Sequence, residues 1–389
     1  MRETKGIGGR IKTKPEDFLV EEIPKEGKTS GREHAIFWVE KVNLDTQDVV
    51  RILSRKLHVS RKRFGYAGTK DKFAVARQRF SVWDPDFSLE KKLGEIRAKR
   101  FRIYGIERGG RITLGDLKGN RFTVTIRDID LEEGEIRKRL ERIFEELKRG
   151  VPNFFGEQRF GGIRPVTHLV GLEMLRGNFE NAVRIYVAKP FDREPEDVRK
   201  IREFLWENWG NRRCYLKGLR EFPKRFRYER AMLDYLYKHP RDFVGALRRV
   251  PKRIRKLFVN AVQAKIFNRV LKLLLERKGV EGLKNAEIPL PGYDTVFGER
   301  EEERMVKESM ERLGISRADF LLKSVPEMRT SGSRRKAVIE VGDVKLLRIG
   351  EDEVNKGRML ATVTFSLPPG SYATVVLEKI MKGEIDAFC

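Results

Sequence analysis

The chain has 389 residues, 40% of them hydrophobic, and this length exceeds one compact core and predicts two domains. Lys and Arg number 83 against 58 Asp and Glu, and the resulting formal charge of +25 predicts a polyanionic partner such as nucleic acid. The two cysteines, Cys214 and Cys389, exclude a disulfide framework and a multi-thiolate zinc site, and favour a reducing cytoplasm.

The many charged residues have one alternative explanation. Ion-pair networks suited to high temperature would explain the 36% of charged residues, but not the excess of basic over acidic ones. The first residues contain no apolar run of signal-peptide length, and no segment reaches about 18 uninterrupted apolar residues. We therefore expect neither a leader peptide nor a membrane span.

The N-terminal part of the sequence alternates between strand and helix patterns. Two β-rich segments, 18–20 and 35–39, precede a helix that Asp45 or Thr46 would cap. In the segment 77–82, apolar residues then alternate with polar and basic ones, which is typical of a strand with one buried face.

The pattern changes twice further along the chain. A second alternating strand at 121–126 is followed by a helix with one apolar stripe over 136–147. The segment from about 166 to about 335 is mainly helical, and its longest periodic run covers 254–275. Alternation returns at 359–367, before a turn rich in proline and glycine.

These patterns predict an α+β fold with a mixed, largely antiparallel sheet built from both chain ends, plus an inserted, mainly helical α/β domain. The expected catalytic domain comprises residues 1–165 and 340–389, and the expected insertion comprises residues 166–339.

Cofactor sites with recognisable sequence patterns are missing. The four histidines are scattered without an i,i+4 pair, so we expect them to be surface or packing residues rather than metal ligands. The segment 6–11 lacks the third glycine of a dinucleotide fingerprint, and the segment 68–70 lacks the upstream glycine of a P-loop. We therefore expect no metal and no cofactor.

Two glycine-rich segments have the polar residues that a site needs. In the segment 65–72, Asp71 lies between two lysines after a glycine turn, so its carboxylate could act as nucleophile or base, or belong to an ordinary surface loop. In the segment 115–122, Asn120 could bind a base edge and Phe122 could stack on a base, although Phe122 also fits the buried face of a strand.

A third segment, 153–162, interleaves aromatic, amide, guanidinium and glycine residues directly after a helix. This mixture suits the binding of unstacked bases and phosphates, and it equally suits a junction between domains.

Six ordered segments together resemble the TruD family of tRNA pseudouridine synthases, in its archaeal form. They span both ends and the middle of the chain, whereas residues from about 172 to 250 have no match and resemble an enlargement of the family's insertion domain. The segments are KTKPEDFLVEEI at 12–23, AGTKDK at 67–72, GDLKGNRF at 115–122, VPNFFGEQRFGG at 151–162, FVNAVQAKIFNRVL at 258–271 and LPPGSYATVVL at 367–377.

The resemblance implies roles for particular residues. It makes Asp71 the catalytic aspartate, Lys12 a basic active-site residue, and Asn120 the residue that orients the aspartate. Phe122 is expected to pack on the target base, and Tyr372 stands where many relatives have phenylalanine. Three residues of the third segment are expected to bind substrate, namely Phe155, Gln158 and Arg159.

The implied activity is the isomerisation of a tRNA uridine, at position 13, to pseudouridine by a cytoplasmic monomer without an obligate protein partner. The alternatives are a non-catalytic RNA-binding or ribosome-assembly protein, and an RNA methyltransferase, for which no cofactor loop is evident. A basic cluster within the insertion could bind the tRNA backbone or be a solvated charged face. It comprises Arg212, Arg213, Lys217, Arg220, Lys224, Arg225 and Arg227.

Overall fold

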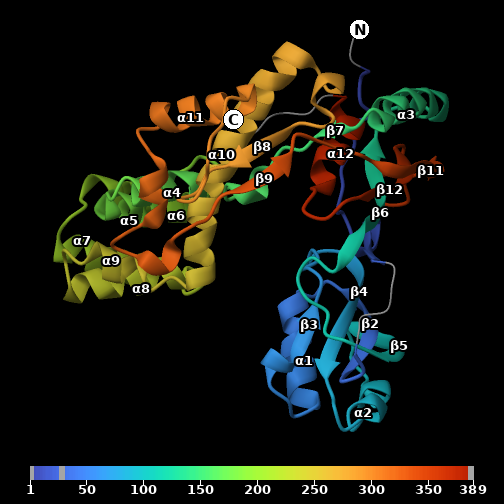
Figure 1. Cartoon of the computed structure of the whole chain (residues 1–389), viewed down its shortest axis with the longest axis horizontal. Helices are drawn as coiled ribbons and strands as arrows, with labels where there is room; N and C mark the ends of the chain where they lie inside the picture. The colour runs from blue at the N-terminus through green and yellow to red at the C-terminus, as the bar shows by residue number, and fades with distance from the viewer. Residues whose placement is uncertain (1–3, 26–30, 384–389) are drawn as a thin grey trace. The chain divides into compact units, whose positions relative to one another are not determined.

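The computed structural model describes residues 4–25 and 31–383, which form two compact units (Figure 1). The first unit runs up to Val151 and resumes at Ile339, and the second comprises Pro152–Val338. The chain passes from the first unit to the second within the short strand β7 (Val151–Pro152), and it returns within the short strand β10 (Val338–Ile339). The sequence placed the first boundary later, after residue 165, but the glycine-rich segment 153–162 packs into the second unit.

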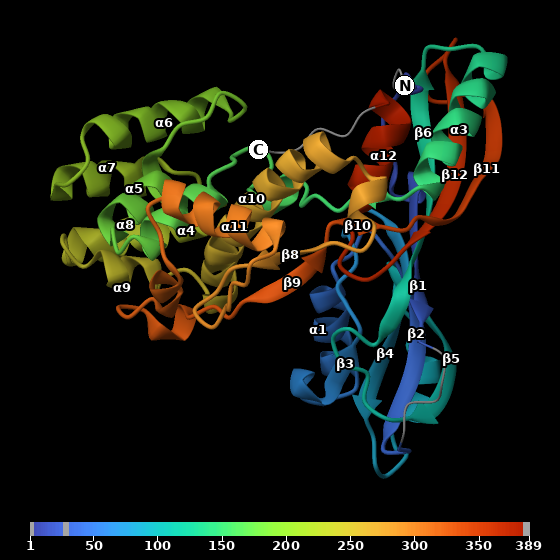
Figure 2. The same cartoon turned by 45° about the horizontal axis from the view of Figure 1, so that its top comes forward.

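The described part of the first unit is built on an eight-stranded sheet in the order β11-β12-β6-β1-β4-β2-β5, with β3 beside β4. Among these strands the β1–β4 pair is parallel and the other neighbours are antiparallel. The C-terminal β12 lies beside β6, and β11 lies beside β12 (Figure 2), which confirms the predicted sheet from both chain ends. The strands are β1 (Phe18–Pro24), β2 (His34–Val42), β3 (Phe64–Tyr66), β4 (Val75–Trp83), β5 (Phe101–Gly109), β6 (Leu117–Ile129), β11 (Gly342–Glu351) and β12 (Met359–Leu367).

Helices pack on this sheet through the apolar stripes that the sequence contains. The Asp45 side chain caps α1 by accepting a hydrogen bond from the backbone N–H of Gln47 at 2.7 Å, and buried Val49 and Leu53 pack in the same core as Phe37. In α3 the predicted stripe is buried along its whole length. The helices are α1 (Thr46–Lys56), α2 (Glu90–Glu95), α3 (Glu133–Lys148) and α12 (Ala373–Lys382).

The second unit is mainly helical, and its longest helix is largely buried. The helix α10 packs against α4 so closely that a Cβ on Gly171 would lie 2.1 Å from the carbonyl oxygen of Phe258. A two-stranded antiparallel sheet of β8 (Glu287–Leu290) and β9 (Ser333–Lys336) completes the unit. The helices are α4 (Thr167–Leu175), α5 (Phe179–Ala188), α6 (Glu196–Glu207), α7 (Arg212–Glu221), α8 (Arg227–Lys238), α9 (Phe243–Leu247), α10 (Lys252–Lys278) and α11 (Glu301–Arg312).

Candidate active site

Asp71 lies in the first unit, in the loop between β3 and β4. Its side chain is 45% exposed, and one carboxylate oxygen accepts a hydrogen bond of 2.7 Å from the Lys12 ammonium. The same ammonium lies 4.4 Å from the centroid of the Phe18 ring. The backbone of Lys12 is in the left-handed region, with φ of 60°, a conformation that costs a non-glycine residue free energy and often occurs at functional sites.

A buried lysine holds the loop that carries Asp71. The Lys41 ammonium donates to the carbonyl oxygens of Leu44 at 2.7 Å and of Asp71 at 2.8 Å, and lies 3.4 Å from that of Lys70. Burial lowers the pKa of Lys41 to about 8, and the nearby charge of Lys70 acts in the same direction, against Asp45 and Asp71. The loop backbone therefore depends on an ammonium that loses its charge more readily than an exposed lysine does.

Further buried polar groups fix the rest of this loop. The Gln78 amide donates to the Gly68 carbonyl at 3.0 Å and accepts from the Thr46 hydroxyl at 2.9 Å. The Lys70 ammonium forms an ion pair of 3.0 Å with Glu22, and both of these side chains are almost completely buried. Asp71 therefore extends from a loop that is bonded to the sheet through Gly68 and Lys70 and to α1 through the backbone N–H of Lys70, which donates to Thr46 at 3.1 Å.

The register of the sheet brings Asn120 and Phe122 to the same face as Glu22. Asn120 pairs directly with Glu22 of β1, and Phe122 pairs with Val20. Directly opposite residues on neighbouring strands share a face, so Asn120 and Phe122 lie on the side to which the Asp71 loop is bound through Lys70.

The Asn120 amide oxygen lacks a hydrogen-bond partner in the described part of the chain, whereas the Phe122 ring has close aromatic neighbours. The amide oxygen of Asn120 is buried without a hydrogen-bond partner among the described residues, and no hydrogen bond there joins Asn120 to Asp71. Phe122 is 8% exposed, its ring centroid lying 6.1 Å from that of Phe18 and 5.4 Å from that of Phe365. A series of contacts thus runs from Asp71 through Lys12 and Phe18 to Phe122.

Tyr372 belongs to the same unit. It is the N-cap residue of α12, just after the turn that follows β12, and β12 pairs with the Asn120 strand through Leu367. The fold accordingly places it near the end of the strand pair that carries Asn120.

The three remaining candidates lie in the second unit. Phe155 is buried, with its ring edge against Phe267 and its backbone bonded in both directions to the Asn268 amide. Gln158 is exposed, and Arg159 is half-buried with its guanidinium 5.2 Å from the Phe155 ring centroid. Their role in substrate binding stays a prediction.

Sequence reasoning missed the buried groups that hold the Asp71 loop. One signal was available, because Lys41 continues the alternation of Ala35, Phe37 and Val39 at a position where a buried apolar residue is expected. Glu22 likewise follows Phe18 and Val20 on a buried face. A charged residue at a strand position where a buried apolar side chain is expected indicates that the charge has a specific hydrogen-bond or ion-pair partner inside the protein.

Two general properties hold over residues 4–25 and 31–383. None of the helices in these ranges is long and apolar enough to cross a membrane. In the same ranges, no group of three or more His, Cys, Asp and Glu side chains is arranged to hold a metal ion.

Comparison with known proteins gives a family. The sequence model of tRNA pseudouridine synthase D (TruD) matches residues 1–285 and 281–380. The chain belongs to the TruD family. This membership confirms the expected enzyme class, an isomerase that forms pseudouridine.

Individual TruD relatives match along almost the whole chain. A Methanosarcina mazei protein named "Probable tRNA pseudouridine synthase D" is 35% identical over 98% of this chain and 94% of its own length. The Archaeoglobus fulgidus protein of the same name is 36% identical over 98% and 97%. A crystal structure of TruD from Methanosarcina mazei matches with a TM-score of 0.78 at 34% identity, over 97% of this chain and 94% of that one, which confirms the α+β fold.

Proposed function

We propose that this chain isomerises uridine 13 of tRNA to pseudouridine, and that Asp71 is the carboxylate that acts on the substrate. The observation that carries the proposal is the 2.7 Å ion pair between Lys12 and a half-exposed Asp71. This ion pair lies on the side of the sheet that carries the unpaired amide oxygen of Asn120 and the aromatic ring of Phe122. The choice of uridine 13 rests on the family resemblance.

The chemistry requires a carboxylate and a closed site. Pseudouridine forms when the bond from C1′ to N1 breaks, the uracil turns, and C5 bonds to C1′. One proton leaves C5 and one arrives at N1, so no atoms are gained or lost. Such an isomerisation needs neither redox agent nor energy source, which supports a reaction without a cofactor.

The residues of the first unit suit distinct roles in this reaction. The Asp71 carboxylate can attack C1′, add to the base, or abstract a ribose proton, and each route requires the anion. The Lys12 ammonium fixes the direction of that carboxylate through their hydrogen bond. Lys41 acts only through the backbone of the loop, so we propose it as a positioning residue.

The target base would be recognised on the sheet face. A uracil attached through N1 has one N–H donor, at N3, and the unpaired oxygen of Asn120 is a matching acceptor. The exposed edge of Phe122 and the ring of Tyr372 would pack against the flipped base. Substrate contacts from the second unit are proposed for Phe155, Gln158 and Arg159 on the basis of the family motif.

The tRNA backbone would contact the basic surface of the second unit. The seven basic residues of the 212–227 cluster are all exposed, as phosphate binding requires. We further propose a cytoplasmic monomer, in keeping with the two cysteines and the tRNA substrate.

The proposal is tested with purified protein and an unmodified tRNA transcript carrying tritium at C5 of its uridines. Because C5 loses its hydrogen, turnover releases tritium to water, and mapping then locates the pseudouridine. We expect release and a product at position 13, both abolished in a transcript with cytidine there. Release without a product at position 13 would reject the proposed target, and no release would reject the activity.

A further inference from the structure

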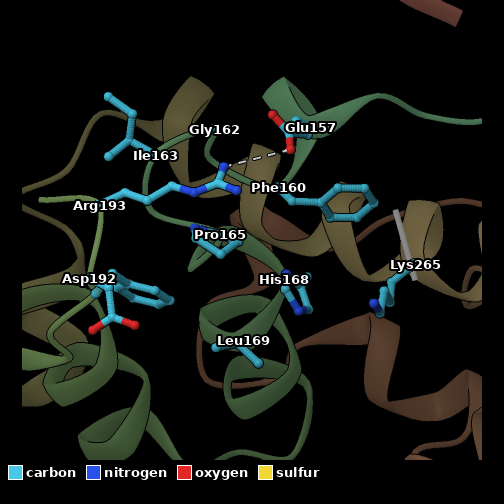
Figure 3. Close-up of a pocket in the computed structure, with 11 residues that line it drawn as sticks. Glu157, Phe160, Gly162, Ile163, Pro165, His168, Leu169, Asp192, Arg193 and Lys265 are labelled. Carbon is cyan, nitrogen blue, oxygen red and sulfur yellow. Dashed lines mark ion pairs between the residues drawn. The ribbon is translucent and has the colours of Figure 1, made fainter. Parts of the chain in front are cut away.

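The second unit contains a pocket of about 580 Å³, within the range of about 300–1,000 Å³ that is typical of small-molecule sites. It is formed by the turn before α4, by the first turn of α4, by the loop between α5 and α6, and by Lys265 of α10 (Figure 3). Its walls combine the rings of Phe160, Phe191 and His168 with the charged groups of Lys265 and Arg193.

His168 is the central polar group of this pocket. Its ring meets Phe160 edge to face at 5.5 Å, and its Nδ1 atom is buried without a hydrogen-bond partner among the described residues. Burial lowers the pKa of His168 to about 4, and the charges of Lys265 and Lys189 act in the same direction. A neutral imidazole offers one donor and one acceptor, which suits the edge of a heterocycle.

Two cations and two carboxylates line the pocket, namely Lys265, Arg193, Glu157 and Asp192. Arg193 lies 3.9 Å from Glu157, and both side chains are at least half exposed, so a stronger anion can replace this weak pairing. The Lys265 ammonium reaches toward His168 from α10 (Figure 3). The site therefore presents aromatic surface and a neutral ring, with charged groups of both signs around them, and its two cations are the groups that an anion would contact.

The turn that forms one wall is held rigidly. The Arg164 guanidinium donates to the carbonyl oxygens of Tyr186 at 3.0 Å and Lys189 at 3.2 Å, and forms an ion pair of 3.1 Å with buried Glu194. Gly161 has φ of 117°, and a Cβ there would lie 2.0 Å from the Arg164 carbonyl oxygen. The pocket is thus shaped by backbone that the interior of the unit fixes in place.

We propose that this pocket binds one unstacked nucleotide of the bound tRNA, with its base against Phe160 and His168 and its phosphate near Lys265 and Arg193. A purely apolar ligand would leave the His168 nitrogen unsatisfied, and a simple anion would not use the rings. A nucleotide uses both. The inference rests on the proposed function, because it takes tRNA as the substrate, but it concerns a site separate from Asp71.

Photocrosslinking tests the proposal on the wild-type protein. Ultraviolet light is applied to the complex with tRNA, and peptide–nucleotide adducts are located by mass spectrometry. We expect adducts on Phe160, His168 or Phe191. Adducts elsewhere in the protein but on none of these residues overturn the proposal.

Binding by matched variants gives a second test. His168→Phe keeps the ring and removes its nitrogens, so the Kd for tRNA should rise about three- to tenfold, as for the loss of one hydrogen bond. Lys265→Gln should lower the slope of log Kd against log salt by about one phosphate contact. The controls are the exposed His239→Phe and, on the same helix outside the pocket, Lys272→Gln. If the pocket variants bind like their controls, the proposal is wrong.

Titration with free nucleotides distinguishes a nucleotide of bound tRNA from a free small molecule as the ligand of this pocket. The four 5′-mononucleotides are titrated while the His168 ring signals are followed by NMR, with and without tRNA. We expect weak millimolar binding that tRNA displaces. Tight binding of one mononucleotide that tRNA does not displace would overturn the proposal in favour of a small-molecule ligand. The activity assay stays independent, because pseudouridine formation without pocket adducts rejects only this site.

Discussion

At the scale of single residues, the loop that carries Asp71 depends on a buried side chain. Lys41 is completely buried and its ammonium joins the carbonyls of Leu44, Lys70 and Asp71. A lysine takes such a position only where it satisfies backbone groups that would otherwise be buried without partners. The direction of the Asp71 side chain is therefore set partly by Lys41.

We predict that Lys41→Met lowers kcat by up to about a hundredfold, because a small displacement of a catalytic group can cost that much. The KM for tRNA should change little, since the side chain is buried. Single-turnover kinetics at saturating tRNA measure the effect, with the exposed Lys56→Met as control. A variant with wild-type kcat would show that Asp71 does not need this support.

The lowered pKa of Lys41 predicts that kcat depends on pH. Because burial lowers its pKa to about 8, Lys41 is charged below that pH and becomes neutral above it. The neutral amine has fewer N–H donors than the three carbonyls around it, so kcat should fall as pH rises through about 8. This alkaline decrease should be absent from Lys41→Met. The same decrease in both proteins would assign it to another group.

Substitution of Lys12 should lower turnover less than substitution of Asp71. Lys12→Met removes the 2.7 Å hydrogen bond to the carboxylate but leaves the anion itself, so we expect reduced rather than abolished turnover. The nearby Lys14, paired only at 3.9 Å with Glu353, provides the control Lys14→Met. Complete loss of activity in Lys12→Met, with folding and tRNA binding intact, would instead indicate a direct chemical role.

At the scale of elements, a buried charge cluster joins helices of the second unit. Arg202 of α6 is fully buried, and its guanidinium contacts Glu194 at 2.9 Å and Glu229 at 3.0 Å. The guanidinium lies 5.1 Å from the ring centroid of Phe222 and 5.6 Å from that of Phe226. Removing the cation leaves two buried carboxylates with only Arg164 nearby.

Arg202→Met should therefore lower the free energy of unfolding by about 3 kcal/mol. Lys200→Met on the same helix breaks an exposed pair with Glu196 and should lower the free energy of unfolding far less. Chemical denaturation followed by circular dichroism compares the two variants. Equal stability of both would mean that the cluster contributes nothing net to the fold.

Most helices and strands were predictable from the sequence, because buried apolar residues recur along each element every second residue in a strand and every three to four residues in a helix. Alternation identified β4, β6 and β12, and the apolar stripe identified α3, although strand pairing needed the structure. The structure divides the chain at Val151, before the segment 153–162 and earlier than the sequence predicted, because the contact of that segment with Asn268 joins residues distant in sequence. The same reason hid the pocket at His168, which the sequence classed with surface or packing residues.

The candidate site was predictable in a different way. Asp71, Lys12, Asn120 and Phe122 were chosen from motifs, and the structure brings them into one region of the first unit. Composition could not show that Asn120 lacks a hydrogen-bond partner or that Phe122 is mostly buried, because both depend on neighbours across the sheet.

At the scale of the whole molecule, the formal charge of +25 should govern affinity for RNA. We predict that the Kd for tRNA rises steeply with salt, because bound Lys and Arg residues displace counterions from phosphates. Reversing Arg212, Arg213 and Arg220 to Glu should weaken binding and reduce the salt slope, whereas the same changes at Arg137, Lys138 and Arg142 provide a control. A flat salt response would mean that charge is not the source of affinity.

The measurement that tests the central claim most directly is the activity of Asp71→Asn on unmodified tRNA. The substitution keeps the size of the side chain and removes the anion, so pseudouridine formation should fall at least about a thousandfold while tRNA binding and stability stay near wild type. The matched control is Asp130→Asn, an exposed aspartate that also pairs with one cation, Arg358, and should retain full activity. A near wild-type yield of pseudouridine from Asp71→Asn would contradict the assignment and favour a protein that binds RNA without acting on it at this site.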